Sequence, residues 1–291
     1  MRPSDLVKTF RVRRGETFHL DAVDPGETRG FKSKKNADAA LTKGVLRLAA
    51  LQEKLYADDH WAVLLIFQAM DAAGKDSTIK HVMSGVNPQG TQVFAFKVPS
   101  AEELDHDFLW RTTKCLPERG RIGIFNRSYY EEALVVRVHP EFLDRQRLPG
   151  HLTGRNLWKQ RFESINDYER HLVRNGTLVL KFFLHVSRDE QRRRFLARLE
   201  EPSKNWKFSA GDLVERDRWD DYMYAYEEMI QHTATRHAPW FVVPADHKWF
   251  TRLVVVESII DALEGLDLAY PTLSADQRTA MKAAKATLER E

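Results

Sequence analysis

A glycine and a lysine follow a strongly apolar run and could together bind phosphate. Residues 70–76 read M-D-A-A-G-K-D, so Gly74 and Lys75 match the last two positions before the hydroxyl residue of a phosphate-binding loop. In such a loop, backbone N–H groups and a helix N-terminus surround an anion, and the lysine adds a positive charge beside the terminal phosphates. Ala69 replaces the usual first glycine, and Asp76 replaces the hydroxyl residue that would reach Mg²⁺. The prediction therefore rests on the position of the loop directly after an apolar run.

An acidic residue inside the same loop indicates a bound cation. The carboxylate of Asp71 would repel phosphate unless a cation lay between them. Mg²⁺ prefers oxygen ligands from one or two carboxylates plus phosphates, so we expect Asp71 to hold Mg²⁺ directly or through water, with Mn²⁺ as the alternative ion. The other explanation is that Asp71 only forms a turn and that Asp76 or Ser77 caps the following helix. Capping is the simpler explanation for Asp76.

A second group of polar residues follows a later apolar run in F-N-R-S-Y-Y-E-E, residues 125–132. Open α/β sheets bind ligands beyond the carboxyl ends of their strands, which is where this group is expected to lie. Asn126 offers a neutral oxygen to a metal, and Arg127 could fork onto a phosphate. Glu131 or Glu132 could accept a hydrogen bond from the amino group of a base. The alternative is a capped helix with glutamates in its first turn.

Cationic residues recur along a polar stretch that is interrupted by Pro202 and Gly211. They are Arg188, Arg194, Arg198, Lys204, Lys207, Arg216 and Arg218. Such a density of positive charge would suit a mobile lid that closes over an extended phosphate chain. The alternative is a solvated helix with Arg/Glu pairs, and the stretch taken alone favours that alternative.

The apolar runs predict the elements that position these residues. They cover residues 62–67, 92–96, 122–125, 178–184 and 240–243, with helix-length stretches between them. Runs that are apolar at every position suit parallel strands covered on both faces, so we predict a three-layer α/β/α sandwich. A helix is expected from about 36 to 56. We see no linker or repeat and expect one domain, 1–291, with an N-terminal arm and helix (about 1–60), a lid (about 198–221) and a surface helix or frayed tail (about 274–291).

Composition excludes several classes of protein. The 291 residues are 43% hydrophobic and 30% charged, which excludes wholesale disorder. A formal net charge of +3 is too small to indicate a polyanionic partner by itself. The only cysteine, Cys115, cannot form an internal disulfide, so we expect a reducing, cytoplasmic location. The longest apolar run, residues 61–67, is far too short to span a membrane, and no export signal is visible.

Taken together, four motifs resemble the family-2 polyphosphate kinases over roughly residues 30–264. The motifs are M-D-A-A-G-K-D (70–76), G-V-N-P-Q-G (85–90), F-N-R-S-Y-Y-E (125–131) and W-K-F-S (206–209). Ala69 and Asn126 stand where other members carry Gly and Asp. The Y-Y-E continuation, in place of N-R-A-G, is similar to the branch that accepts nucleoside monophosphates as well as diphosphates.

The resemblance implies Mg²⁺-dependent, reversible phosphoryl transfer between inorganic polyphosphate and AMP or ADP, giving ADP and ATP, on a P-loop kinase-like core with a helical lid. It implies that Asp71 and Asn126 serve the metal, that Lys75 and Arg127 act on the transferring phosphoryl, and that Glu131 supports use of a monophosphate. The remaining expected substrate-binding residues are Ala72, Ala73, Gly74, Asp76, Ser77, Lys80, Arg188, Lys207, Arg216 and Arg218.

The resemblance also implies a cytoplasmic homo-oligomer, either a dimer or a tetramer, with no nucleic-acid or membrane partner. Two other functions fit some of the same residues. An ATP-dependent nucleotide kinase could use the same core, because Lys75 does not distinguish phosphate donors. A non-catalytic polyanion-binding or RNA-binding module could use the cations, but it would not require a buried phosphate loop that contains Asp71.

Overall fold

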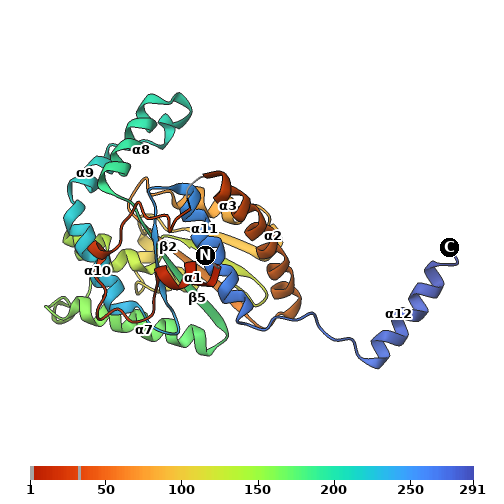
Figure 1. Cartoon of the computed structure of the whole chain (residues 1–291). Helices are drawn as coiled ribbons and strands as arrows, with labels where there is room; N and C mark the ends of the chain where they lie inside the picture. The colour runs from red at the N-terminus through yellow and green to blue at the C-terminus, as the bar shows by residue number, and fades with distance from the viewer. Residues whose placement is uncertain (1–2, 32–33) are drawn as a thin grey trace.

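The computed structural model describes residues 3–31 and 34–291, and within them it places a six-stranded sheet at the centre of the molecule (Figure 1). The strands lie in the order β1-β6-β5-β2-β4-β3. Their bounds are β1 (Arg11–Val12), β2 (Ala62–Gln68), β3 (Thr91–Ala95), β4 (Ile122–Asn126), β5 (Thr177–His185) and β6 (Trp240–Pro244). Strands β2 to β6 are parallel, which confirms the prediction, and only the two-residue β1 pairs antiparallel, with β6. β1 is too short to leave a pattern in the sequence.

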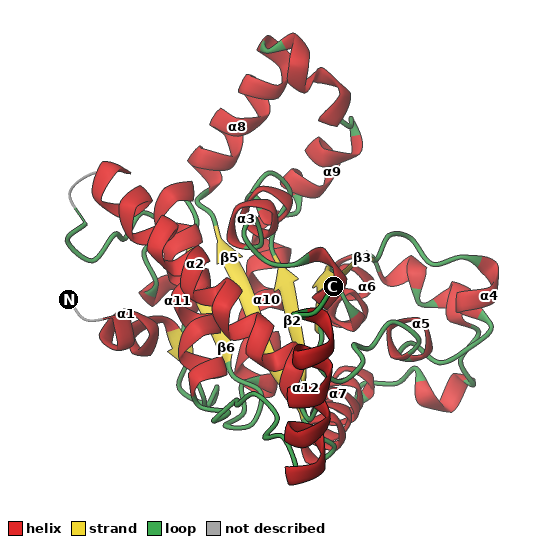
Figure 2. Cartoon of the chain, turned by 90° about the vertical axis from the view of Figure 1, so that its right-hand side faces the viewer, coloured by secondary structure: helices red, strands yellow, loops and turns green. Residues whose placement is uncertain are grey.

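Helices cover both faces of the sheet, so the predicted three-layer sandwich is confirmed (Figure 2). On one face, α2 (Lys34–Asp58) packs on α11 (Lys248–Glu264), and α1 and α3 also contact α11. On the other face, α7 (Leu157–Arg174) packs on β5 and on α10 (Trp219–Thr233). The other helices are α1 (Pro3–Phe10), α3 (Lys75–Val82), α4 (Ala101–Leu104), α5 (Trp110–Thr113), α6 (Val135–Val138), α8 (Arg188–Glu200), α9 (Gly211–Asp217) and α12 (Ala275–Leu288). α2 confirms the helix expected from about 36 to 56.

The core explains why the central strands are mostly apolar, whereas the edge strand β3 (Thr91–Ala95) has no buried residue and so does not match the prediction of a strand covered on both faces. All seven residues of β2 are buried, because helices lie above and below the central strand. Three phenylalanines stack across neighbouring strands: Phe67 on Phe182 at 5.0 Å between ring centroids, and Phe182 on Phe241 at 5.2 Å. This stack joins β2, β5 and β6 into one rigid support for the residues at their carboxyl ends.

A charged network is buried between α7, β5 and the turn that follows β4. The ammonium of Lys181 donates to Glu169 Oε2 (2.6 Å), to the Tyr130 hydroxyl (3.0 Å) and to the Thr233 carbonyl (2.8 Å). Glu169 Oε1 also accepts from the hydroxyls of Tyr129 (2.9 Å) and Tyr130 (2.8 Å). Neither charged side chain is exposed to solvent. The network therefore holds the side chains of the two tyrosines of the Y-Y-E motif in place through their hydroxyl groups.

Two parts of the chain project from the sandwich. α8, the short helix η7 (Pro202–Lys207) and α9 extend beyond the carboxyl ends of the strands, so the projection includes residues that precede the lid expected at about 198–221 (Figure 1). α12 forms the helix anticipated in the C-terminal stretch and lies away from the sheet (Figure 1). Within residues 3–31 and 34–291, each helix is too short or too polar to cross a lipid bilayer.

Candidate active site

The loop after β2 is the one predicted to bind phosphate, and it is called the phosphate loop below for that predicted ligand. Ala72 (φ +60°) and Gly74 (φ +108°) both have left-handed backbone angles, which turn the chain sharply from the strand into α3. Glycine suits the second position because a side chain there would be strained. Lys75 begins α3, and its ammonium donates back to the carbonyl of Ala69 at 2.7 Å. The side chain is only 8% exposed, so the charge lies within the loop and not in open solvent.

Burial makes Lys75 easier to deprotonate than an ordinary lysine. Its pKa is lowered to about 8, first by desolvation and then by the positive charge of Arg127. The carboxylates of Asp71, Glu131 and Asp76 oppose this shift. A phosphate that entered the loop would add further negative charge beside the ammonium and would raise this pKa again.

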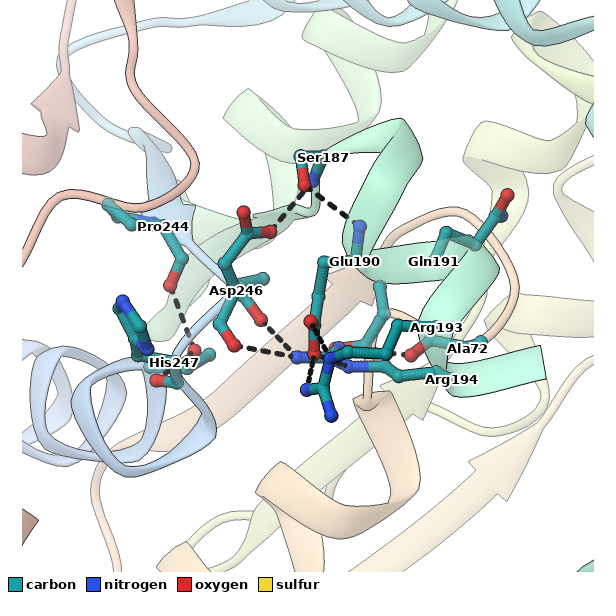
Figure 3. A network of polar contacts seen from close by, with 12 residues as sticks. Ala72, Ser187, Glu190, Gln191, Arg193, Arg194, Pro244, Asp246 and His247 are labelled. Atoms are coloured by element: carbon teal, nitrogen blue, oxygen red, sulfur yellow. Dashed lines mark hydrogen bonds and ion pairs between the residues drawn. The ribbon is translucent and has the colours of Figure 1, made fainter. Parts of the chain in front are cut away.

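Arg194 holds the loop from the side of α8 (Figure 3). Its guanidinium donates to the carbonyls of Ala72 (3.0 Å) and Ala73 (2.7 Å), and also to those of Ala245 (2.6 Å) and Asp246 (3.1 Å) after β6. Glu190, which belongs to the same helix, accepts from Arg194 Nε at 2.6 Å. Arg194 therefore ties α8, the phosphate loop and the end of β6 together.

Arg127 lies between two carboxylates at the end of β4. One guanidinium nitrogen donates to Asp71 at 2.9 Å, and the other lies 3.4 Å from Glu131. The pKa of Arg127 is raised, mainly by the charge of Glu131, so the guanidinium stays protonated. Its backbone has φ +65°, and the buried Ser128 that follows accepts a hydrogen bond from Gln68 at 3.2 Å. The turn thus aims a permanent cation at the phosphate loop.

The two glutamates of the motif face different surroundings. Glu131 lies beside Arg127 and Tyr226, and burial raises the pKa of its carboxyl group. Glu132 accepts from Arg161 at 3.2 Å and from Gln146, so its carboxylate is engaged away from the loop. Of the two glutamates considered from the sequence, Glu131 is the one near the candidate site.

Oxygen atoms suited to a hard cation gather beside Lys75. The amide nitrogen of Asn126 donates to Asp76 Oδ1 at 2.6 Å, which leaves the amide oxygen as the atom that Asn126 can offer a cation. Asp71 and Asp76 supply carboxylates on the same cavity wall. Two carboxylates, one amide oxygen and room for water or phosphate oxygens match the preferences of Mg²⁺, so the residues fit this ion.

These residues line a cavity of about 650 Å³ between the strand ends and α8. Among the residues that the structure describes, nine of those lining it are Lys or Arg and three are Asp or Glu. Residues singled out from the sequence that line it are Asp71, Ala72, Gly74, Lys75, Asp76, Ser77, Asn126, Arg127, Arg194, Arg198, Lys204 and Lys207. Ala73, Lys80, Glu131, Arg188, Arg216 and Arg218 are not among the residues that line it. The cavity is therefore a strongly cationic space that opens onto the phosphate loop.

The predicted lid cations lie in different places. Arg216 donates to Gln191 (2.7 Å), and Gln191 in turn donates to the Asp71 carbonyl (3.0 Å), so Arg216 reaches the loop through one intermediate. Arg188 lines a separate cavity with Trp219 and Tyr224. Their expected contacts with substrate stay predictions.

Sequence reasoning missed three cations of the cavity: Lys97, Arg193 and Lys248. Lys97 comes shortly after β3, and Lys248 begins α11 shortly after β6. The rule that ligands bind beyond the carboxyl ends of parallel strands would have found both, had it been applied to every strand. Arg193 neighbours Arg194 in a run of three arginines. Both line the cavity, but only Arg194 also binds the carbonyls of the loop, and the sequence alone does not show this difference.

The amino-acid sequence of this chain matches a known protein family and several of its members. A family model described as polyphosphate kinase 2 matches residues 31–270. The chain is 55% identical over 273 residues to an ADP-polyphosphate phosphotransferase of Rhodopseudomonas palustris, with 94% of each chain covered. It is 44% identical over 266 residues to an AMP/ADP-polyphosphate phosphotransferase of Meiothermus ruber, with 91% of this chain and 96% of the relative covered.

A solved structure has the same fold. The crystal structure of a polyphosphate kinase 2 from Arthrobacter aurescens TC1 superposes with a TM-score of 0.89 at 42% sequence identity, and the match covers 100% of this chain and 98% of the other. The family resemblance inferred from four motifs is confirmed.

Proposed function

The chain belongs to the polyphosphate kinase 2 family, and we propose that it catalyses Mg²⁺-dependent, reversible phosphoryl transfer from inorganic polyphosphate to AMP and ADP. One observation carries the proposal most directly. Lys75, whose ammonium is buried, lines a cavity together with eight other lysine and arginine residues. A single nucleotide does not require so many cations, whereas a chain of phosphates carries a negative charge on each unit and would use them along its length.

The residues of the site can supply what phosphoryl transfer needs. The reaction passes through a loose transition state, so catalysis depends on positioning and on positive charge more than on a protein nucleophile. The terminal phosphoryl of the polymer would lie between Lys75 and Arg127, where a nucleotide phosphate oxygen attacks in line. Both cations stabilise charge on the transferring oxygens. Arg194 holds the loop in place through its hydrogen bonds to the carbonyls of Ala72 and Ala73.

Asp71, Asn126 and Asp76 would hold the metal ion, directly or through water. When bound, Mg²⁺ neutralises charge on the phosphate oxygens and orients them. Asp71 also pairs with Arg127 (2.9 Å), so an ion at Asp71 would compete with that pair and free the guanidinium for phosphate. The metal ligands and the guanidinium are thus linked through one carboxylate.

The test supplies purified protein and Mg²⁺ with AMP or ADP and with either polyphosphate or ATP as the sole donor. We expect ADP and ATP to form from polyphosphate, and we expect chelation of the metal to stop the reaction. Phosphorylation with ATP alone would instead identify an ATP-dependent nucleotide kinase. Polyphosphate binding without any product would identify a polyanion-binding module. The same assay run backwards, from ATP to polymer, tests reversibility.

We expect Glu131→Gln to weaken use of AMP more than use of ADP. The carboxylate of Glu131 lies 3.4 Å from Arg127, so we propose that it holds the guanidinium in position. A monophosphate presents fewer phosphates to the cations and depends more on the exact position of Arg127. The measurement is the ratio of kcat/KM for the two acceptors, with the exposed Glu163→Gln of α7 as the matched control. Equal losses on both acceptors would refute the role in monophosphate use.

We also expect polyphosphate binding without nucleotide to weaken above about pH 8. Below the pKa of Lys75, near 8, the ammonium is charged in both free and bound protein, so affinity does not depend on its protonation. Above that pH, binding must first take up a proton, and affinity falls by up to about tenfold per pH unit. Calorimetric titration between pH 7 and 9.5 measures the affinity for polyphosphate.

The Lys75→Arg variant should lose the pH dependence of this affinity, because arginine stays charged. A wild-type affinity that does not change up to pH 9.5 would contradict the role of the Lys75 ammonium in binding.

Three further features remain part of the proposal. They are a cytoplasmic location, a homo-oligomeric assembly of two or four copies, and ATP as both product and reverse substrate. The absence of nucleic-acid and membrane partners is likewise a prediction.

A further inference from the structure

The projection formed by α8, η7 and α9 leaves the sandwich through α8 and returns to it through α9 (Figure 2). Its first limb, α8, is fixed at the phosphate loop by Arg194. Arg198, which also lines the cationic cavity, comes four residues later, or about 6 Å farther along the helix axis. The position of Arg198 over the cavity therefore also depends on what holds the second limb, α9.

Two side-chain contacts join α9 to α8. Asp212 accepts from Arg198 Nη1 at 3.0 Å. Arg216, one turn later on α9, donates to Gln191 Oε1 (2.7 Å) and to the Arg188 carbonyl (2.8 Å). A guanidinium carries five N–H groups, so Arg198 keeps donors for a phosphate while one of them binds Asp212. A displacement of α9 would therefore displace Arg198 within the cavity.

Glu215, between these two residues of α9, binds the sandwich. Its Oε2 accepts from His139 Nε2 at 2.9 Å and from the Tyr222 hydroxyl at 2.6 Å. An ionised carboxylate can only accept, so His139 Nε2 carries the proton of this bond. Burial raises the pKa of Tyr222, and the hydrogen bond to Glu215 raises it further, so the hydroxyl stays protonated and donates. Two donors from separate elements thus meet on one oxygen of α9.

His139 is a fixed point for this contact. It follows α6 directly and precedes the short helix η4 (Pro140–Phe142), and it is only 7% exposed. Its ring stacks on Phe142 at 5.3 Å between centroids, and Nδ1 lies 3.2 Å from Glu141 Oε1. Packing on one face and a polar partner on each nitrogen leave the imidazole little freedom to turn. The donor that reaches Glu215 is therefore preorganised.

We propose that His139 is a positioning residue for the polymer, because it fixes α9 through Glu215 and thereby holds Arg198 over the phosphate cavity. His139 itself is not among the described residues that line the cavity, so it acts without touching the substrate. The inference rests on the proposed function, since a chain of phosphates is the ligand that would use Arg198. Lys75 and Arg127 keep their own contacts, so losing the His139–Glu215 bond should weaken polymer binding and spare the chemical step.

The first test compares steady-state kinetics of the wild type, Glu215→Ala and His139→Ala with polyphosphate as donor and saturating ADP. We expect both variants to raise KM for polyphosphate at least about fivefold and to change kcat less than about twofold. A merely structural role would instead lower the fraction of active enzyme, and with it kcat, at constant KM. The side chain of Glu215 is 31% exposed, so its removal leaves no large cavity. An unchanged KM in Glu215→Ala, or a loss confined to kcat, overturns the proposal.

Three further variants examine the contact itself. His139→Gln should restore KM to within about twofold of wild type, because an amide can still donate to Glu215. Glu141→Ala removes the carboxylate on the other side of the same ring and should leave KM unchanged. The double variant His139→Ala/Glu215→Ala should raise KM no further than Glu215→Ala alone, since both changes break one contact. Failure of the glutamine rescue, a loss in Glu141→Ala, or additive losses in the double variant would each contradict the role of His139.

The second test measures hydrogen–deuterium exchange without substrate. Amides of α9 should exchange faster in Glu215→Ala than in wild type, whereas those of α7 should not change. Unchanged exchange at α9 overturns the inference whatever the kinetics show. The two failures can be told apart: wild-type protein that makes no ATP from polyphosphate and ADP refutes the proposed function and this role together, while an active wild type with an unchanged KM in the variants refutes this role alone.

Discussion

Replacing Lys75 by alanine should abolish phosphoryl transfer while leaving the fold intact. The ammonium lies 2.7 Å from the Ala69 carbonyl at the start of α3, where the terminal phosphoryl is expected to bind. Removing one preorganised charge from such a site costs on the order of 10³-fold in kcat. Steady-state assays with polyphosphate as donor measure the loss. The circular dichroism spectrum should not change, because alanine suits the first turn of a helix.

The matched control is Lys43→Ala, which removes the same charge from the exposed side of α2. That variant should keep wild-type activity, since Lys43 does not line the cavity. Turnover by Lys75→Ala within tenfold of wild type would refute the assignment of the loop. An equal loss in the Lys43 variant would show instead that the overall charge of the protein, and not the position of Lys75, controls the rate.

Much of the fold and of the phosphate loop could be predicted because both depend on local signals. The central strands of the parallel sheet are mostly apolar runs, and β2, with all seven residues buried, shows the physical reason. The loop carries Gly74 and Lys75 directly after that strand, so its place at the sheet edge follows from sequence order. Asp71, Asn126 and Arg127 then meet there because β4 pairs beside β2.

Contacts between distant segments could not be predicted in the same way. Arg194 looks like any member of a charged surface helix, yet its guanidinium binds carbonyls at residues 72, 73, 245 and 246. Arg194 also pairs with Glu190, four residues earlier on the same helix, at 2.6 Å, which is the kind of Arg/Glu pair typical of a solvated helix. The helix α8 thus contains Arg/Glu pairs within itself and is also hydrogen-bonded to the loop. Residue spacing in the sequence predicts the pairs within the helix, but it does not predict the bonds to the loop.

Buried charged residues also could not be predicted from the pattern of apolar and polar residues. Lys181 interrupts an apolar strand, and Glu169 lies in an otherwise charged helix, so neither residue reveals its burial or its partner. Only the packing of α7 on β5 brings them within 2.6 Å. The pair then supports Tyr129 and Tyr130, which directly precede Glu131. The Y-Y-E motif, from which we predict the choice of acceptor, is thus held in place by Lys181 and Glu169, which belong to none of the four motifs.

The largest expected effect on stability comes from Lys181→Met. The substitution would leave the carboxylate of Glu169 fully buried, with two tyrosine hydroxyls but without its cation. Breaking a buried ion pair from one side typically costs about 3–5 kcal/mol, because an uncompensated charge stays in a medium of low dielectric. Urea unfolding at equilibrium should show a loss of this size in the free energy of unfolding. A loss below about 1 kcal/mol would contradict the description of the network.

Two companion variants separate the buried charge from other effects of the substitution. Lys159→Met removes the same side chain from α7, where Lys159 lies 3.9 Å from Glu163 in solvent, and should change stability by at most about 0.5 kcal/mol. Lys181→Met combined with Glu169→Gln removes both charges, while the amide oxygen can still accept from Tyr129 or Tyr130. The double variant should therefore be more stable than Lys181→Met alone. If it is not, lost packing around the lysine stem, and not the unpaired carboxylate, determines the cost.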